Sequence, residues 1–234
     1  GMTWNLGDEW IWQFRKVDRR VLIIRKNTRF RAGNSGPLAT ALKYAYSDSV
    51  LFSIPIIAKG PRGGDLIDLS SVFMTDLPQI SQRLPGFIFS RSKSIWGPVK
   101  TFPDNVELRV AATYASGGTA NLESVADSRG ATVTVHYSIS RLQTTGYQPR
   151  LADDRIGYFL TVAKDYSKKN NEEQFTRYIN RWHLQKAEPG AKVSPPKTPI
   201  VFWIENTVPF KYRSTVRDGI EEWNKAFEKT GIVG

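Results

Sequence analysis

The side chains that most often carry out nucleophilic or metal chemistry are scarce in this sequence. None of the 234 residues is Cys, and the only His residues are His136 and His183, which lie far apart in the chain. The lack of Cys excludes thiol nucleophiles, disulfides and Cys-ligated zinc, and two His cannot form a three-His metal site. The adjacent carboxylates Asp153 and Asp154 would point to opposite faces of a strand, so they do not converge on one substrate atom. We therefore expect no catalytic and no metal-binding residue here, and two His residues at the surface or in hydrogen bonds.

One charged cluster lies beside aromatic residues. Arg150, Asp153 and Arg155 fall within residues 146–159, together with three aromatic residues. Because a guanidinium binds a carboxylate through two parallel hydrogen bonds, the arginines can hold an acidic ligand, or they can pair with Asp153 and fix a turn. We expect the structural ion pair and keep the ligand contact as the alternative.

The net charge of +11 is concentrated in one short stretch. Residues 15–31 hold eight basic residues and one acid, Asp18, so they contribute 8 − 1 = +7 of the total. Such a stretch can bind a polyanion, including nucleic acid. The candidate contacts are Arg19, Arg20, Arg25 and Arg29. The same pattern is typical of two amphipathic strands with a buried apolar centre and solvated charged ends, which we expect here, with no nucleic-acid partner.

The apolar periodicity predicts a mainly antiparallel β unit with few helices, followed by a strand–helix unit, and therefore an α+β fold. Two long β-branched runs, 106–114 and 132–142, predict a hairpin with a long Gly-containing loop. The other predicted strands cover 10–32 (two strands around a turn at Asp18-Arg19), 49–58, 65–69, 86–97 (a strand and a turn), 159–164 and 174–186. The predicted helices of this part cover 38–46 and 71–84.

A Pro-rich segment predicts a domain boundary. Residues 187–199 contain four prolines and read as a stiff, extended connector. It separates a predicted β domain, residues 1–186, from a second unit, residues 200–234.

The second unit is predicted to be a strand followed by a helix. Residues 200–204 (IVFWI) are all apolar, which indicates a strand buried on both faces. Residues 212–229 carry apolar side chains at helical spacing, and Gly231 is expected to end that helix. We expect Trp203 and Trp223 to be core residues that hold the helix on the strand.

Three segments together resemble a bacterial family of secreted zinc metalloproteases of the metzincin type. They are residues 150–159 (RLADDRIGYF), 178–184 (YINRWHL), and 199–204 (PIVFWI) followed by 219–227 (GIEEWNKAF). A weaker likeness at 102–107 (FPDNVE) extends the resemblance over nearly the whole chain. The resemblance implies a non-catalytic accessory region that supports, shapes or covers a protease cleft, followed by the first strand and helix of a catalytic domain.

The same resemblance implies where the chemistry lies. The family's zinc signature, His-Glu-x-x-His-x-x-Gly-x-x-His, does not occur in this sequence. The resemblance therefore implies zinc in the parent protein and no cofactor in this chain. Its implied partners are the remainder of the catalytic domain in cis and a protein or peptide substrate. Arg150, Asp153 or Arg155 would then contact the cleft, if they are not structural.

The first residues of the sequence and its longest apolar run indicate where the protein could be located in or outside the cell. Gly1 before Met2 suggests a tag remnant, so we expect a piece of a longer protein, secreted or periplasmic by the resemblance. No export signal is visible, and the apolar run 50–58 is too short for the ~20 residues of a membrane span. Two other functions stay open: a polyanion-binding β module and a purely structural scaffold.

Overall fold

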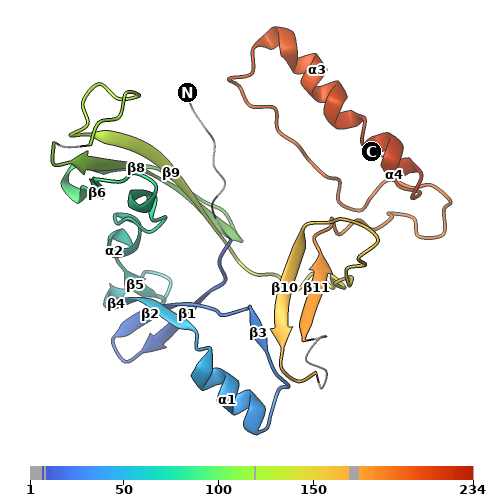
Figure 1. The fold of residues 1–234 in the computed structure, drawn as a ribbon, viewed down its shortest axis with the longest axis horizontal. Coiled ribbons are helices and arrows are strands. Elements are labelled where there is room, and N and C mark those ends of the chain that lie inside the picture. Colours follow the sequence, from blue (N-terminus) through green and yellow to red (C-terminus); the bar gives the residue numbers. More distant parts are fainter. Residues whose placement is uncertain (1–6, 8, 119, 169–173, 234) are drawn as a thin grey trace. The chain divides into compact units, whose positions relative to one another are not determined.

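The chain divides into two compact units. The computed structural model describes residues 7, 9–118, 120–168 and 174–233 (Figure 1). Unit 1 comprises residues 1–145 and 163–176, and unit 2 comprises residues 146–162 and 177–234. The strands β10 (Leu160–Asp165) and β11 (Phe175–Ile179) contribute residues to both units. The mainly antiparallel strands and the few helices confirm the predicted α+β class.

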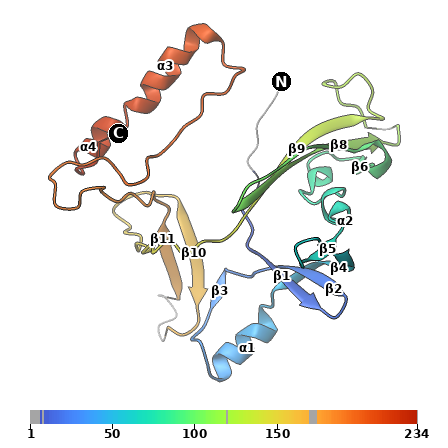
Figure 2. The same cartoon turned by 180° about the vertical axis from the view of Figure 1, so that it is seen from behind.

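Unit 1 contains two antiparallel sheets. The first has the strand order β1-β2-β4-β5, and the second is built on β8, which pairs with β6 and β7 along one edge and with β9 along the other. The strands are β1 (Trp12–Val17), β2 (Arg20–Arg25), β4 (Ser49–Lys59), β5 (Asp65–Ile67), β6 (Phe87–Phe89), β7 (Ile95–Thr101), β8 (Asn105–Ser116) and β9 (Ala131–Ser140). A short strand, β3 (Phe30–Arg31), pairs in parallel with β10. Figures 1 and 2 show β8 and β9 as one long curved pair, which confirms the predicted hairpin.

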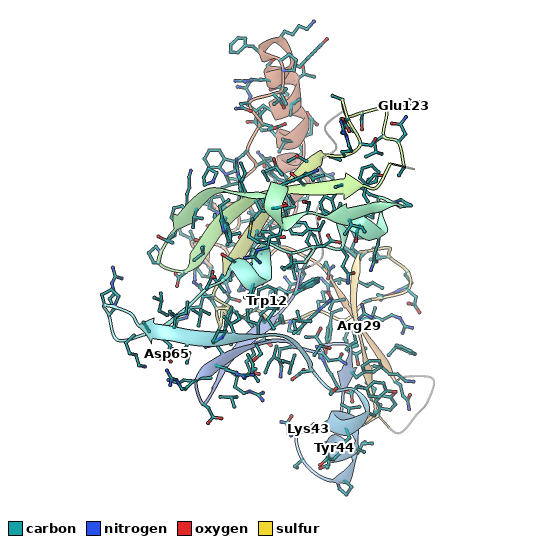
Figure 3. The ribbon with its side chains drawn as sticks, turned by 90° about the vertical axis from the view of Figure 1, so that its left-hand side faces the viewer. Trp12, Arg29, Lys43, Tyr44, Asp65 and Glu123 are labelled. Atoms are coloured by element: carbon teal, nitrogen blue, oxygen red, sulfur yellow. The ribbon has the colours of Figure 1, made fainter. Side chains whose placement is uncertain are left out.

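The core of unit 1 lies between these two sheets. Alternate residues of β8, from Leu108 to Tyr114, are buried because the side chains of a strand point to its two faces in turn. They pack in one cluster with Ile23 and Ile54 of the first sheet and with Phe73 of the short helix α2 (Ser70–Phe73). Figure 3 shows Trp12 inside this layer, where its ring stacks on Phe73 with centroids 6.2 Å apart.

Two backbone features set the strand register. Asp18 has φ +50° at the turn between β1 and β2, a conformation that Asp tolerates, and the predicted turn is confirmed. Gly97 lies at the irregularity between β7 and β8, where a Cβ atom would stand 3.0 Å from the Cβ of Arg109. A residue with a Cβ atom would therefore need the two strands to shift apart by a few tenths of an ångström at this point.

The predicted helix at 71–84 was wrong. Only α2 and a 3₁₀ turn at Ile80–Gln82 form there. In a continuous helix Pro78 would lack the N–H that the hydrogen-bond ladder needs and would clash with the preceding turn, and Gln79 adopts φ +54°. The predicted helix at 38–46 is confirmed as α1 (Pro37–Ala45), with Pro37 in its first turn.

Unit 2 carries two helices and an extended Pro-rich segment. The helices are α3 (Phe210–Glu221) and α4 (Asn224–Glu228), so the predicted helix is present but interrupted. Gly231 follows them with φ +81°, and a Cβ there would lie 2.6 Å from the Lys192 carbonyl oxygen, so the predicted glycine cap is confirmed. None of the helices in the described residues is long and apolar enough to cross a membrane.

Two predictions for unit 2 were wrong: the strand at 200–204, and the burial of Trp203 and Trp223 in a core. Residues 200–204 form no strand, and the exposed fractions of Trp203 and Trp223 are 91% and 67%. A strand forms only where a neighbouring strand pairs with its edge, and no described strand pairs with this segment. Burial on both faces would also need a layer packed on each face. Helix α3 likewise has no fully buried residue, and Val216 on its apolar side is 39% exposed.

Candidate functional site

The predicted Arg150, Asp153 and Arg155 cluster is a local turn at the surface of unit 2. The Arg155 side chain donates from Nε and Nη2 to the two Asp153 carboxylate oxygens at 2.8 and 2.6 Å, and its backbone N–H donates at 3.0 Å. These hydrogen bonds, with a smaller contribution from the charge of Arg150, lower the pKa of Asp153 to about 2. The Arg150 carbonyl accepts from the Ile179 N–H at 3.0 Å, which attaches the segment to β11. This is the geometry of an ion pair that fixes a turn, and a ligand contact stays a prediction.

The four candidate arginines of the basic stretch do not form one surface. Arg20 and Arg25 begin and end β2. They lie five positions apart, so they point to opposite faces about 17 Å apart. The Arg25 guanidinium lies 4.3 Å from the ring centroid of Trp10, while Arg19 belongs to the turn before β2. Arg29 lies in the loop before β3, where its backbone N–H donates to Asn27 Oδ1 at 3.2 Å. Their binding of a polyanion therefore stays a prediction that the geometry does not favour.

The two His residues take part in separate polar contacts. His136 Nε2 lies 2.7 Å from Glu107 Oε2, and Ser138 donates its hydroxyl to Glu107 Oε1 at 2.7 Å. The Ser138 hydroxyl bonds to the Glu107 carboxylate and not to the His136 imidazole. Ser138 and His136 therefore do not form a serine nucleophile activated by a histidine base. His183 Nε2 lies 3.1 Å from Gln185 Nε2.

The zinc that the resemblance implies does not fit the residues that the structure describes. Within the described ranges, no group of three or more His, Cys, Asp or Glu side chains can hold a metal ion. A catalytic zinc site takes three such ligands, most often with His among them. Any zinc ligands would therefore have to come from outside these residues.

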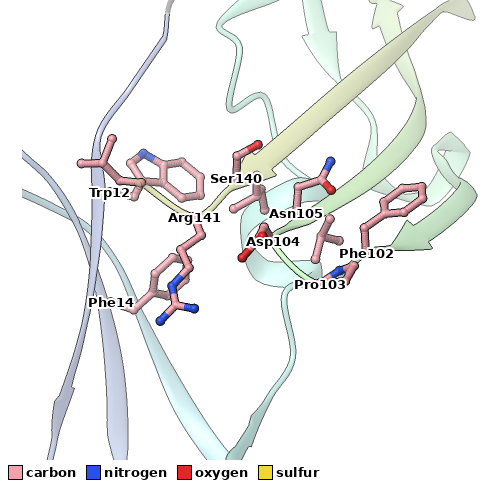
Figure 4. A pocket seen from close by; sticks show the side chains of 11 residues that line it. Trp12, Phe14, Phe102, Pro103, Asp104, Asn105, Ser140 and Arg141 are labelled. Atoms are coloured by element: carbon pink, nitrogen blue, oxygen red, sulfur yellow. The ribbon is translucent and has the colours of Figure 1, made fainter. Parts of the chain in front are cut away.

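One cavity of about 320 Å³ opens on unit 1, beside strand β1 (Figure 4). Its walls are the β1 side chains Trp12 and Phe14, the turn between β7 and β8 (102–106) and the end of β9 (139–142). The wall is mainly apolar, and Phe102 and Leu142 remain 53% and 80% exposed. A concave apolar wall with a few polar groups is typical of a ligand-binding site.

The polar groups of the cavity stand at its rim. Arg141 extends beside Phe14, and the Asp104 carboxylate lies near it (Figure 4). Neither side chain takes part in any of the ion pairs found in the described part of the chain. The indole N–H of Trp12 is buried without an acceptor among the same residues, which is unusual for a buried donor. A second cavity of about 310 Å³, lined by Trp10 and Arg25 among others, also opens on unit 1, so we take the cavity beside β1 as one candidate binding site.

The comparisons with known proteins give a family but no function. A family model described as Domain of unknown function (DUF5117) matches residues 5–187. This chain belongs to the DUF5117 family. The matched region of the DUF5117 chain includes every strand from β1 to β11 and the whole cavity. Neither the curated proteins nor the solved structures contained a match.

The cavity was not among the residues predicted from the sequence. Its walls come from three segments of the DUF5117 domain that are far apart in the chain, and only the fold brings them together. One signal was local: Trp10, Trp12 and Phe14 alternate along a predicted strand, which places these aromatic side chains on one face. The predicted domain boundary at 187–199 stays a prediction.

Proposed function

We propose that this DUF5117 chain is the non-catalytic N-terminal part of a secreted or periplasmic zinc metallopeptidase. In that protein it supports, shapes or covers the cleft of a catalytic domain that follows in cis. Zinc and the catalytic residues belong to that following domain, and the substrate is a protein or peptide. The three segments that resemble metzincin-type proteases support this assignment.

The observation that carries the proposal is the uncovered apolar surface of unit 2. Trp203 is 91% exposed and Phe210 is 86% exposed, in a segment whose sequence is typical of a buried strand and an amphipathic helix. Val201, Phe202 and Trp203 follow one another in the chain and are all at least 60% exposed, and a run of exposed apolar side chains of this kind is typical of an interaction site. A following domain that pairs with residues 200–204 and packs on α3 would bury it.

The Arg150, Asp153 and Arg155 cluster has a supporting place in this proposal. Its carboxylate is already held by Arg155, so its role is to fix the turn that leads to β10. Of the three side chains, that of Arg150 could contact the protease cleft, because none of the ion pairs in the described residues involves it.

The first test is the sequence and metal content of the longer gene product. We expect a His-Glu-x-x-His motif after residue 234, one zinc per full-length protein, and peptidase activity that the present chain alone lacks. A full-length product without that motif, or without zinc, contradicts the proposal. Stoichiometric zinc with activity in the present chain contradicts it equally.

The second test asks whether unit 2 meets the catalytic domain. In the full-length protein, Trp203→Ser should lower peptidase activity and the melting temperature, because it removes a large side chain from the proposed interface between unit 2 and the catalytic domain. The matched control is Tyr44→Ser on α1, where the side chain is 85% exposed and no change is expected. Equal effects of both substitutions, or none from Trp203→Ser, argue against the contact.

A further inference from the structure

We propose that the outer edge of β1 and the cavity beside it bind an extended acidic peptide that carries apolar side chains at alternate positions. The peptide would add to the sheet as a strand next to β1 and place an apolar side chain in the cavity. This inference goes beyond the proposed function and does not depend on it, because the site lies wholly in unit 1.

The first argument is the free edge of β1. It begins the strand order β1-β2-β4-β5, and among the strands that the structure describes it pairs only with β2. An edge strand presents unpaired N–H and C=O groups, which can pair with an added strand. Five of its six residues are exposed, so the edge is accessible.

The second argument is the alternation of side chains along β1. Trp12 and Phe14 belong to the cavity wall, whereas Gln13 and Arg15 do not. Because residues of a strand alternate between faces, an added strand meets Trp12 and Phe14, followed by Lys16, on one face and Arg15 on the other. A peptide with alternating apolar and acidic residues matches both faces.

The third argument is charge. β1 holds Arg15 and Lys16 and no acidic residue, and Arg141 stands at the cavity rim. Lys16 and Lys59 both pair with the carboxylate of Asp65, at 2.8 and 2.5 Å. Among the described residues that line the cavity, Asp104 is the one acid. The surroundings are therefore net positive, which selects an acidic ligand.

A peptide fits this site better than nucleic acid does. Phosphate tracking requires basic side chains aligned along one groove, and Arg20 and Arg25 point to opposite faces of β2. The cavity wall is apolar and suits a side chain such as Phe or Val.

The experiment measures fluorescence anisotropy of a labelled peptide, acetyl-Glu-Val-Asp-Phe-Asp-Val-Glu-amide, with the 234-residue chain. The first matched peptide carries Lys at every acidic position, and the second carries Pro in place of both Val. We expect the acidic peptide to bind with a Kd well below 1 mM, and both matched peptides to bind about tenfold more weakly or worse. The Lys peptide loses charge complementarity, and the Pro peptide loses the N–H groups of strand addition.

Two exposed positions test the location. Phe102→Ala and Arg141→Glu should each weaken the acidic peptide about fivefold or more. Ile88→Ala and Lys43→Glu, at exposed positions that do not line the cavity, should leave it unchanged. The proposal is overturned by no binding of the acidic peptide up to about 1 mM protein, by equal binding of the Lys peptide, or by binding that neither cavity variant weakens. Tighter binding of a single-stranded oligonucleotide than of the acidic peptide overturns it as well.

Discussion

At the scale of single residues, Asp76 organises the turn that replaces the predicted helix. Its Oδ1 atom accepts from the Tyr114 hydroxyl at 2.7 Å and from the Ile80 N–H at 2.8 Å, and its Oδ2 accepts from Ser81. Tyr114 is completely buried, and burial followed by the contact with Asp76 raises the pKa of its hydroxyl. The buried Tyr114 hydroxyl therefore ties β8 to the turn that Asp76 forms with Ile80 and Ser81.

Removing that hydroxyl should destabilise unit 1. Tyr114→Phe keeps the ring but leaves the Asp76 carboxylate with one donor fewer, so we expect the free energy of unfolding to fall by about 1–3 kcal/mol. Urea unfolding followed by tryptophan fluorescence measures the change. Tyr44→Phe, in which an exposed hydroxyl is lost, serves as the control and should stay within about 0.5 kcal/mol of the original. An unchanged midpoint for Tyr114→Phe would show that the bond contributes nothing.

Glu107 should make stability depend on pH. Hydrogen bonds from Ser138, then His136 and Asn105, hold the pKa of this carboxyl below its usual 4.5. The unfolded chain then binds the proton more readily, so the stabilisation is present above pH 4.5 and is lost as pH falls through the folded-state pKa. Glu107→Gln lacks this titration, so the difference in unfolding free energy between the two proteins should shrink below pH 4.5. Urea midpoints across that range measure it, and a difference that is constant with pH contradicts the assignment.

At the scale of elements, the sequence predicted the strands and turns whose formation depends on residues close together in the chain. The hairpin of β8 and β9 and the turn at Asp18 follow from alternation and turn chemistry within a few residues. The helix at 71–84 failed because Pro78 interrupts it and because Asp76 binds the N–H groups of Ile80 and Ser81. The strand at 200–204 failed because its formation requires strands that the described residues do not supply.

The candidate sites also differ in whether they depend on neighbouring residues or on contacts between distant parts of the chain. The pairing of Asp153 with Arg155 joins residues two positions apart, so the sequence was enough to expect it. The cavity depends on β1 meeting two segments about 90 and 130 residues further along the chain, and such a contact is set by tertiary packing. Only its aromatic alternation at Trp12 and Phe14 was visible beforehand.

At the scale of the whole molecule, the two units differ in how much apolar surface they bury. All the buried hydrophobic residues of the described chain except Ile179 belong to unit 1. Ordering the backbone costs roughly 1–2 kcal/mol per residue, whereas burying one Ile contributes roughly 1.5–3 kcal/mol. Unit 2 alone therefore has too little core to balance the loss of chain entropy.

This imbalance predicts unequal protection from hydrogen exchange. In the 234-residue chain, amides of β8 should exchange only through global unfolding, while those of α3 and α4 should exchange orders of magnitude faster through local opening. Mass spectrometry of deuterium uptake measures both regions in one experiment. Because the proposed catalytic domain would bury Trp203 and the apolar side of α3, the full-length protein should slow exchange in α3 and leave β8 unchanged. Equal protection of α3 and β8 in the present chain would contradict the weak core of unit 2, and unchanged exchange of α3 in the full-length protein would contradict the proposed contact.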